Sequence, residues 1–439
     1  MFTVTSQDQN SKSTRPRVVI IGGGFGGLAL AKKLKNAPVD VILLDKHNYH
    51  TFQPLLYQVA IGSIAADSIG FPIRRIFTDY NNFTFNMAEV QKINPEDNTL
   101  TTNIGTVYFD YLIIATGSNT NFFNNKQIEH FAMPMKNIPE ALNLRSLILQ
   151  NLETAIVTKD MDEKFALMTF VVVGGGPTGV ELSGALAEMR RLILGKDYHG
   201  VSKYDMKVYL IEGKAELLAS MSAGASGKAK QFLKEAGVRI YNSVHVQSYD
   251  GLELKIDDGK TIKTRNVFWA AGVKGEMPEG IPAEKILRGN RIDVDEINRV
   301  KGYQNIYAIG DVAAMITPDY PNGHPGVAPT AIQQGEQLGQ NLLNIIKGQP
   351  TRPFKYKDKG SLATIGRNQA VADLGKLHFQ GFFAWLLWGV VHIMSLAGFA
   401  NKGIVFISWA INYFSKNSDN RLVIRYFNIQ TRMSDSDSK

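Results

Sequence analysis

Residues 17–27 have the sequence RVVIIGGGFGG, and this stretch decides the fold. Its apolar part, residues 18–21, is β-branched throughout, which is typical of a strand buried on both faces of a parallel sheet. Residues 28–34, after the glycines, have helical composition, and a second strand-like run at residues 39–44 is followed by Asp45. This order of strand, glycine turn, helix and strand predicts a βαβ unit.

The glycine turn occurs twice, each time after a strand and before a helix. Its G-x-G-x-x-G spacing brings helix N-terminal amides onto a pyrophosphate, because the glycines permit a tight turn and a close approach of the backbone. The second copy lies between strands predicted at residues 170–173 and 207–211, the latter followed by Glu212. The glycines with this spacing are Gly22, Gly24 and Gly27 in the first copy, and Gly174, Gly176 and Gly179 in the second.

The two copies agree beyond their glycine turns. Each continues through two strand-like runs around a polar turn and ends in a small-residue segment, Ala115-Thr116-Gly117 or Ala270-Ala271-Gly272. From the first glycine of the turn to the glycine that ends the copy is 95 residues in the first copy (Gly22 to Gly117) and 98 in the second (Gly174 to Gly272). We therefore predict an α/β fold with two tandem Rossmann-like dinucleotide-binding domains and a C-terminal membrane-associating helical region. The predicted domains are residues 16–125 with 300–350, residues 165–285, and residues 354–439.

An acidic residue follows the second strand of each copy. A carboxylate at this position accepts hydrogen bonds from ribose hydroxyls and repels a 2′-phosphate. Glu212 therefore favours NADH over NADPH, although Lys214 two residues later weakens that preference. Two nucleotide sites indicate two cofactors, and FAD with NADH is the chemically useful pair because a flavin accepts a hydride.

Composition excludes several kinds of chemistry. The chain has no cysteine, so disulfides, thiolate metal sites and cysteine nucleophiles are absent. Its histidines, among them His47, His50, His324 and His392, lack metal-ligand spacing, so we expect no metal site. The net charge of +8 suits an anionic membrane surface. No basic block alternates with aromatic residues, so we do not expect a nucleic-acid partner.

The glycine turns, the segment at residues 115–117 and the pair Gly310-Asp311 resemble the flavoproteins with two dinucleotide-binding domains. Within that superfamily, residues 17–425 are similar to type II NADH dehydrogenases, which are single-subunit NADH:quinone oxidoreductases. The extended strings at residues 52–60, 174–182 and 384–413 carry this likeness. The resemblance implies hydride transfer from NADH to non-covalent FAD and reduction of a membrane quinone without proton pumping. It also implies a homodimer on the cytoplasmic face of a bacterial inner membrane.

The resemblance assigns the cofactor-binding residues copy by copy. In the first copy it implies that Asp311 binds the ribityl or phosphate region of FAD, although an Asp there also suits a helix cap. The implied FAD residues are Gly22, Gly24, Phe25, Gly26, Gly27, Asp45, Lys46, Gln53, Ala115, Thr116, Gly117, Gly310, Asp311 and Ala331. The implied NAD residues are Gly174, Gly176, Pro177, Thr178, Gly179, Glu181, Glu212, Ala271 and Gly272.

Two polar residues are the implied catalytic groups. Glu181 falls in the first turn of the second glycine-turn helix, where a carboxylate also complements the helix dipole. The resemblance implies a role for it in proton handling, and it places Gln333 in a quinone motif of the form Ala-Gln-x-Ala-x-Gln. Pro329 replaces the first Gln of that motif, so the polar anchoring of the quinone ring is in doubt. The implied quinone segment is Ala328, Pro329, Ile332, Gln333 and Gln334.

The C-terminal region contains an uncharged run at residues 381–400. As one helix it would be about 30 Å long, enough to cross a bilayer. We expect residues 401–403 to break it and a second apolar run to follow at residues 404–414. A transmembrane span and a buried core helix are alternatives, but Trp385, Trp388, Trp409 and Tyr413 with flanking basic residues favour a monotopic helix pair.

Two functions other than quinone reduction stay open. The first is a ferredoxin-type reductase, against which the apolar C-terminal runs count. The second is a nucleotide-binding flavoprotein that signals redox state through a partner, and it would show slow turnover with quinone.

Overall fold

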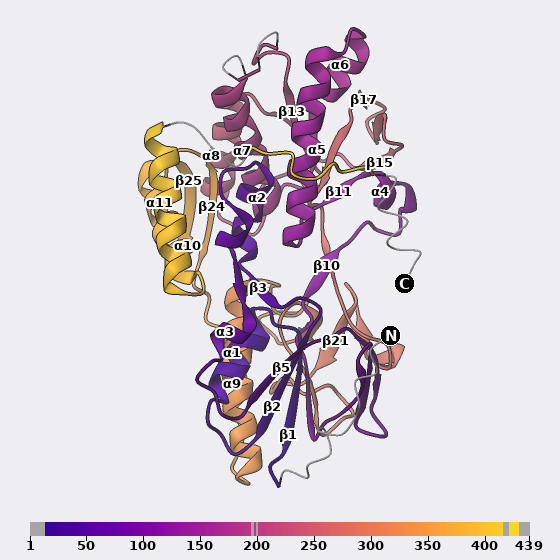
Figure 1. Ribbon diagram of the computed structural model, residues 1–439, viewed down its shortest axis with the longest axis vertical. Coiled ribbons are helices and arrows are strands. Elements are labelled where there is room, and N and C mark those ends of the chain that lie inside the picture. The colour runs from indigo at the N-terminus through magenta and orange to yellow at the C-terminus, as the bar shows by residue number, and fades with distance from the viewer. Residues whose placement is uncertain (1–13, 195–196, 199–200, 416–420, 430–439) are drawn as a thin grey trace. The chain divides into compact units, whose positions relative to one another are not determined.

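The computed structural model describes residues 14–194, 197–198, 201–415 and 421–429, which form two compact units (Figure 1). The first unit comprises Met1–His50, Phe71–Asn119 and Val273–Asp358. The second comprises Thr51–Gly70, Thr120–Gly272 and Lys359–Lys439. Each unit therefore contains one of the two glycine turns.

The first unit is built on a five-stranded parallel sheet of order β22-β9-β1-β2-β5. β1 covers Arg17–Ile21, as predicted, and its side chains alternate between two cores: Val18 and Ile20 face one, Val19 and Ile21 the other. The strand is thus buried on both faces, which confirms the prediction made from its β-branched run. The sheet strands are β1, β2 (Asp40–Asp45), β5 (Phe83–Met87), β9 (Tyr111–Ile114) and β22 (Ile306–Ala308).

Helices α1 (Phe25–Lys33) and α9 (Ala328–Ile346) pack against each other in this unit. Small residues allow the close contact, since a Cβ on Gly335 of α9 would overlap the carbonyl oxygen of Gly26 in α1. The other elements are α3 (Ile73–Ile76), β6 (Val90–Asn94), β7 (Thr99–Thr102), β8 (Gly105–Tyr108), β19 (Val273–Gly275), η3 (Ala283–Lys285), β20 (Ile286–Leu287), β21 (Arg291–Val294), η4 (Gly310–Val312) and β23 (Ala313–Met315). At the unit boundaries lie β3 (Tyr49–Thr51), β4 (Gly70–Pro72) and β10 (Ser118–Thr120).

The second unit repeats the parallel sheet, in the order β11-β18-β12-β13-β14. α7 (Pro177–Ile193) follows β12 just as α1 follows β1, so the predicted duplication is confirmed at the level of topology. The sheet strands are β11 (Met133–Pro134), β12 (Thr169–Val173), β13 (Lys207–Glu212), β14 (Arg239–Asn242) and β18 (Asn266–Trp269). Also present are η1 (Gln53–Leu55), α2 (Leu56–Ala60), η2 (Ala66–Ser68), α4 (Lys126–Phe131), α5 (Ile138–Val157), α6 (Met161–Leu167), α8 (Ala223–Glu235), β15 (Val246–Tyr249), β16 (Glu253–Ile256) and β17 (Thr261–Lys263).

The C-terminal part of the second unit adds an antiparallel sheet that we did not predict. It consists of β24 (Ser361–Gly366), β25 (Gln369–Leu374) and β26 (Leu377–Gln380). β24 packs on α7, and a Cβ on Gly184 would overlap the carbonyl oxygen of Ile365. This sheet covers the glycine-turn helix of the second unit, whereas α9 covers that of the first.

The prediction of one 20-residue apolar helix is wrong. α10 covers Phe382–Ser395 and α11 covers Phe399–Ser415, so the break falls at Leu396–Gly398. Gly398 has φ of +77°, a conformation that ends a helix readily only at glycine. Residues 401–403, where we expected the break, lie inside α11. Among the described residues, no helix is both long and apolar enough to cross a bilayer.

Candidate functional site

The first glycine turn lies at the carboxyl end of β1 and leads into α1. Gly22 has φ of +106°, and a Cβ there would overlap the carbonyl oxygen of Ala115. A Cβ on Gly27 would overlap the carbonyl oxygen of Gly22, whereas one on Gly24 would meet nothing within 4 Å. The fold therefore requires Gly22 and Gly27, and Gly24 opens onto free space, as expected where a backbone approaches a ligand.

The second glycine turn repeats this geometry. Gly174 has φ of +111°, and a Cβ there would overlap the carbonyl oxygen of Ala270. A Cβ on Gly179 would overlap the carbonyl oxygen of Gly174, and one on Gly176 would meet nothing within 4 Å. Both turns thus combine two glycines that the backbone requires with one that faces open space.

The helix N-termini behind the two turns have amides that no side chain caps. Gly24 precedes α1 and Gly176 precedes α7, and neither provides a side-chain hydrogen bond. In α5 and α8, by contrast, the side chains of Asn137 and Ser222 accept first-turn amides. Uncapped amides at the positive end of a helix favour an anion, so both turns fit the pyrophosphate of a dinucleotide.

The acids after the second strands brace the turns. Asp45 accepts the backbone N–H of Gly23 at 2.6 Å and that of His47 at 2.7 Å. Glu212 accepts the backbone N–H of Gly175 and, at 2.7 Å, that of Lys214. Both carboxylates are partly exposed, so each keeps acceptor capacity for a ribose hydroxyl while holding its turn in place.

His50 supports the first turn from beneath. Its Nδ1 lies 3.0 Å from the carbonyl oxygen of Gly23, which can only accept, so Nδ1 carries the hydrogen. Its ring also meets Phe25 edge-on, with the ring centroids 4.9 Å apart. Burial lowers the pKa of His50 to about 4, so the ring is neutral at pH 7 and its role is structural.

Two further segments of the first unit meet beside this turn. Ser118, next to the predicted segment at residues 115–117, donates to the Asp311 carboxylate at 2.5 Å. Gly310 donates its backbone N–H to the Oε1 of Gln334 at 2.7 Å, and Gln334 is buried. The structure therefore gives Gln334 a positioning contact to the Gly310-Asp311 turn. Lys46 forms an ion pair at 2.8 Å with Glu276, whose carbonyl oxygen accepts the Thr116 hydroxyl.

Gln333 and the proposed quinone segment form the first turns of α9. Pro329 lies at the first or second helical position, where a missing backbone N–H costs no helical hydrogen bond. The Gln333 amide both donates to the backbone carbonyl of Lys357 and accepts its N–H, each at 3.0 Å. Gln333 is therefore held by Lys357, while its second amide hydrogen and second oxygen lone pair stay available to a ligand.

Glu181 is the fifth residue of α7, so it lies just beyond the first turn in which we predicted it, and it is buried, with only 8% of the residue exposed. Burial raises the pKa of Glu181 to about 8, although the Thr364 backbone N–H at 3.5 Å and the nearby Trp388 indole each offset part of that rise. The Trp388 N–H itself does not reach hydrogen-bond geometry with any group among the described residues. At pH 7 the Glu181 carboxyl is therefore mostly protonated and able to exchange a proton near neutrality.

A cavity of about 80 Å³ lies against Glu181. It brings together three of the predicted residues, Gln53, Thr178 and Glu181, all in the second unit. Tyr57 lines the same cavity, and burial together with the charge of Glu181 raises its pKa well above its usual value. The complete lining is Gln53, Pro54, Leu56, Tyr57, Met135, Lys136, Thr178 and Glu181.

Two tryptophans that we assigned to the membrane interface belong to the surroundings of this cavity. Trp388 is 3% exposed, so it is a core residue and not a surface anchor. The Trp409 indole N–H donates to the Oε1 of Gln58 at 2.8 Å, and Gln58 in turn donates to the Tyr57 hydroxyl at 2.9 Å. Tyr57 and Gln58 belong to the distinctive string at residues 52–60, but its sequence alone carried no sign of a partner more than 300 residues away.

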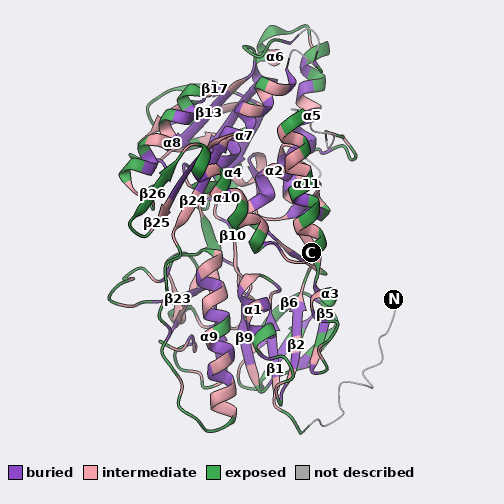
Figure 2. Cartoon of the chain, turned by 90° about the vertical axis from the view of Figure 1, so that its left-hand side faces the viewer, coloured by how far each residue is buried: buried purple, intermediate pink, exposed green. Residues whose placement is uncertain are grey.

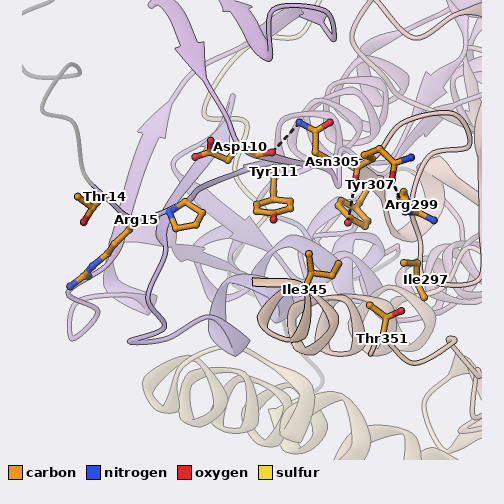
Figure 3. Close-up of a pocket in the computed structure, with 12 residues that line it drawn as sticks. Thr14, Arg15, Asp110, Tyr111, Ile297, Arg299, Asn305, Tyr307, Ile345 and Thr351 are labelled. Carbon is orange, nitrogen blue, oxygen red and sulfur yellow. Dashed lines mark hydrogen bonds between the residues drawn. The ribbon is translucent and has the colours of Figure 1, made fainter. Parts of the chain in front are cut away.

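A larger cavity, about 820 Å³, lies elsewhere in the first unit (Figure 3). It is lined by Arg15 and Pro16 before β1, Asp110 and Tyr111 at the start of β9, and Asn305 before β22. These positions mark the amino ends of the strands. Dinucleotides bind at the carboxyl ends of parallel strands, where the glycine turn lies, so this cavity is not the nucleotide site.

Comparison with known proteins accounts for both parts of the chain. Residues 16–335 match the family model described as pyridine nucleotide-disulphide oxidoreductase, and residues 359–416 match the NDH2 C-terminal domain. A type II NADH:quinone oxidoreductase of Mycobacterium tuberculosis, NdhA, is 36% identical over 432 residues, covering 94% of this chain and 91% of that protein. The chain belongs to the type II NADH:quinone oxidoreductase family. Because it contains no cysteine, the disulphide chemistry in the first model's name does not apply to it.

More distant members of the same group share the fold. The internal alternative NAD(P)H-ubiquinone oxidoreductase A1 of Arabidopsis thaliana mitochondria is 28% identical, over 91% of this chain and 84% of that protein. The solved structure of NDH2 from Plasmodium falciparum in complex with NADH has a TM-score of 0.86 at 24% identity, covering 94% of this chain and 100% of that one. This likeness confirms the predicted fold class, including the C-terminal region that distinguishes the type II family.

Proposed function

We propose that this protein is an FAD-dependent type II NADH:quinone oxidoreductase that works on a membrane surface. It oxidises NADH and reduces a quinone. The single observation that carries this function is the pair of glycine turns with the same geometry, one in each unit, followed by the C-terminal domain characteristic of the family.

The residues divide between two nucleotides. The turn at Gly22–Gly27 and the uncapped N-terminus of α1 fit the pyrophosphate of FAD, with Asp311 held by Ser118 at the next strand end. The turn at Gly174–Gly179 fits that of NADH, and Glu212 faces the adenosine ribose. Bound FAD supplies a ring that accepts a hydride and releases electrons singly or in pairs.

Protons are handled by the protein's own groups. Glu181 keeps a proton at pH 7 because it is buried, and its raised pKa lets it give or take that proton within the physiological range. In our proposal it buffers the proton that accompanies quinone reduction. The proposed quinone segment is the start of α9, where Gln333, held by Lys357, would offer its remaining amide hydrogen to the quinone ring.

The C-terminal helices suit a peripheral position on a membrane. α11 points polar side chains toward its own unit: Asn401 donates to the carbonyl of Gly70 at 3.2 Å and Asn412 to that of Ser63 at 2.7 Å. Both α10 and α11 carry exposed residues (Figure 2), and many of these have large apolar side chains. The most exposed of them are Phe383, Met394, Phe406, Ile407, Ile411 and Phe414.

Exposure of such an apolar surface to water is unfavourable in free energy, whereas its contact with a lipid interface is favourable. We therefore propose monotopic attachment, on the cytoplasmic face where NADH is available. A homodimer, which the resemblance alone supports, belongs to the same proposal.

The test is steady-state oxidation of NADH and of NADPH by the detergent-solubilised protein with a short-chain quinone. We expect NADH oxidation to depend on quinone, and NADPH to be at least ten times poorer in kcat/KM. The proposed activity would be excluded if NADH reduced the flavin but added quinone reoxidised it no faster than the background rate measured without quinone. Sedimentation with anionic vesicles, compared with a Phe406→Asp/Phe414→Asp variant, tests the membrane part separately.

A further inference from the structure

The cavity at Glu181 is connected to helix α11 by a chain of hydrogen bonds. The chain runs from the Trp409 indole to the side-chain amide of Gln58, and from that amide to the hydroxyl of Tyr57. Tyr57 and Glu181 both line the cavity. All four residues belong to the second unit, so the connection lies within one compact body.

The direction of this chain is fixed by chemistry. An indole N–H can only donate, so the Gln58 oxygen must face Trp409. The Gln58 nitrogen must then face Tyr57, and the phenol oxygen becomes an acceptor for it. Because the phenol accepts from Gln58, its single hydrogen is left for an acceptor on another side.

Glu181 is the carboxyl group that lines the same cavity, and in the structure it is not hydrogen-bonded to Tyr57. The charge of Glu181 raises the pKa of Tyr57, as expected when a carboxylate lies close to a phenol. Glu188 on α7 acts on Tyr57 in the same sense. The other charged or titratable groups from the surrounding elements are Lys136, which lines the cavity, and the buried Arg145 on α5.

The neighbouring helix α10 adds no charge to this environment. The Trp388 ring packs against that of Trp409 in a tilted arrangement with centroids 5.1 Å apart, and His392 stacks on Trp388 at 4.3 Å. Burial lowers the pKa of His392 to about 4, so it is neutral throughout the range in which Glu181 titrates. Arg367, from the β24–β25 turn, acts on Glu188 rather than on Glu181.

We propose that Trp409, Gln58 and Tyr57 form a directional hydrogen-bond relay by which helix α11 holds the Tyr57 hydroxyl hydrogen on the Glu181 side of the cavity. Tyr57 and Gln58 are thus positioning residues for the proton of Glu181. A catalytic role for the relay rests on the proposed function, because it requires Glu181 to exchange a proton during turnover. The hydrogen-bond arrangement itself does not depend on that role.

Removing the donor at the start of the relay changes its direction. In Trp409→Phe the Gln58 amide is free to turn, and the Tyr57 hydroxyl then donates to the Gln58 oxygen instead of pointing to the Glu181 side of the cavity. The charged form of Glu181 loses the favourable dipole of that hydroxyl, so the titration midpoint of Glu181 rises. Tyr57→Phe removes the same hydroxyl directly and gives the same upward shift.

The experiment is pH-difference infrared spectroscopy on the purified full-length holoenzyme in detergent. The carboxylic-acid band that disappears in Glu181→Gln reports the protonation of Glu181 whether or not the enzyme turns over. We expect raised midpoints in Trp409→Phe and Tyr57→Phe, and a Trp409→Phe/Tyr57→Phe midpoint no higher than that of Tyr57→Phe. Trp385→Phe on α10, which removes an indole outside the relay, is the matched control and should keep the wild-type midpoint.

Three results would overturn the relay: an unchanged or lowered midpoint in Trp409→Phe, an additive shift in the double variant, or an equal shift in Trp385→Phe. The pH profile of kcat/KM for NADH, measured on the same variants, separates the relay from the proposed function. If the infrared midpoint of Glu181 shifts but the pH profile of kcat/KM does not, the relay exists, and the titration of Glu181 has no part in the catalytic cycle.

Discussion

The two glycine turns share one backbone design but have different surroundings. Gly22 and Gly174 take nearly the same φ, and Asp45 and Glu212 brace their turns through equivalent amides. α1 is covered by another helix, α9, whereas α7 is covered by strand β24. At the position where α7 carries Glu181, α1 carries Ala29. The shared geometry suits a pyrophosphate in both copies, and the two copies differ in what packs against their glycine-turn helices.

The substitution with the largest expected effect tests whether each glycine turn binds one nucleotide. Gly179→Ala places a Cβ on the carbonyl oxygen of Gly174, so NADH affinity should fall at least a hundredfold, by isothermal titration calorimetry, while flavin absorbance is retained. The matched variant Gly27→Ala should instead lose flavin. Loss of flavin from Gly179→Ala with NADH binding intact would reverse the assignment.

A second test concerns the carboxyl that distinguishes α7 from α1. The pKa of Glu181 is raised from its usual value to about 8 in the folded protein, so the folded state binds more protons than the unfolded state between about pH 4.5 and 8. Stability should therefore fall as pH rises through this window, by roughly 5 kcal/mol, and then level off.

Glu181→Gln should remove that slope, so its Tm should gain on the wild type as pH increases from 5 to 8. Thermal unfolding followed by circular dichroism at each pH measures this. Ala29→Gln on α1 serves as the control, because it adds the same side chain to the other copy without removing a titrating group. Parallel curves for wild type and Glu181→Gln would contradict a buried, titrating carboxyl.

A third test sharpens the comparison of the bracing acids. Glu212→Gln keeps an oxygen for the Gly175 amide but removes the negative charge, so kcat/KM for NADPH should rise about tenfold relative to NADH. Asp45→Asn, the equivalent change in the first unit, should leave the NADH/NADPH ratio unchanged. An altered ratio in Asp45→Asn would mean that the acids do not divide between two nucleotides.

The smallest expected effect separates two adjacent glutamines in the first unit. Gln333→Ala should raise the KM for quinone by about threefold, because it removes a single neutral hydrogen bond to the quinone ring. Gln334→Ala leaves the part-buried Gly310 N–H without its acceptor, so it should weaken flavin retention instead. Flavin loss in Gln333→Ala would show that the two roles were exchanged.

The local motifs were predictable, and the contacts around them were not. The glycine spacing, the strand-end acids and the duplication follow from backbone sterics within about 30 residues, so one sequence suffices to find them. The burial of Glu181 depends on Thr364 and Trp388, roughly 180 and 200 residues away. No periodicity encodes such contacts. The partnership of Gln58 with Trp409 was missed for the same reason, and the indole was mistaken for a lipid-facing residue.

The break between α10 and α11 was misplaced because residues 401–403 contain a polar pair and a glycine. In the structure Asn401 faces its own unit and donates to Gly70, so it continues a helix that it was expected to end. Composition alone cannot tell a polar residue that stops a helix from one that docks it. The assigned boundary at Gly398 carried a weaker sequence signal than the one we chose.

The way α11 is attached has a practical consequence for handling this enzyme. Its inward contacts include amide and indole hydrogen bonds, while most of its large apolar side chains point outward. The side of α11 that we propose contacts lipid is therefore opposite the side that docks on the protein. Charged replacements confined to the outward side should yield a detergent-free enzyme with its nucleotide pockets intact, suited to crystallisation and to rapid-mixing kinetics.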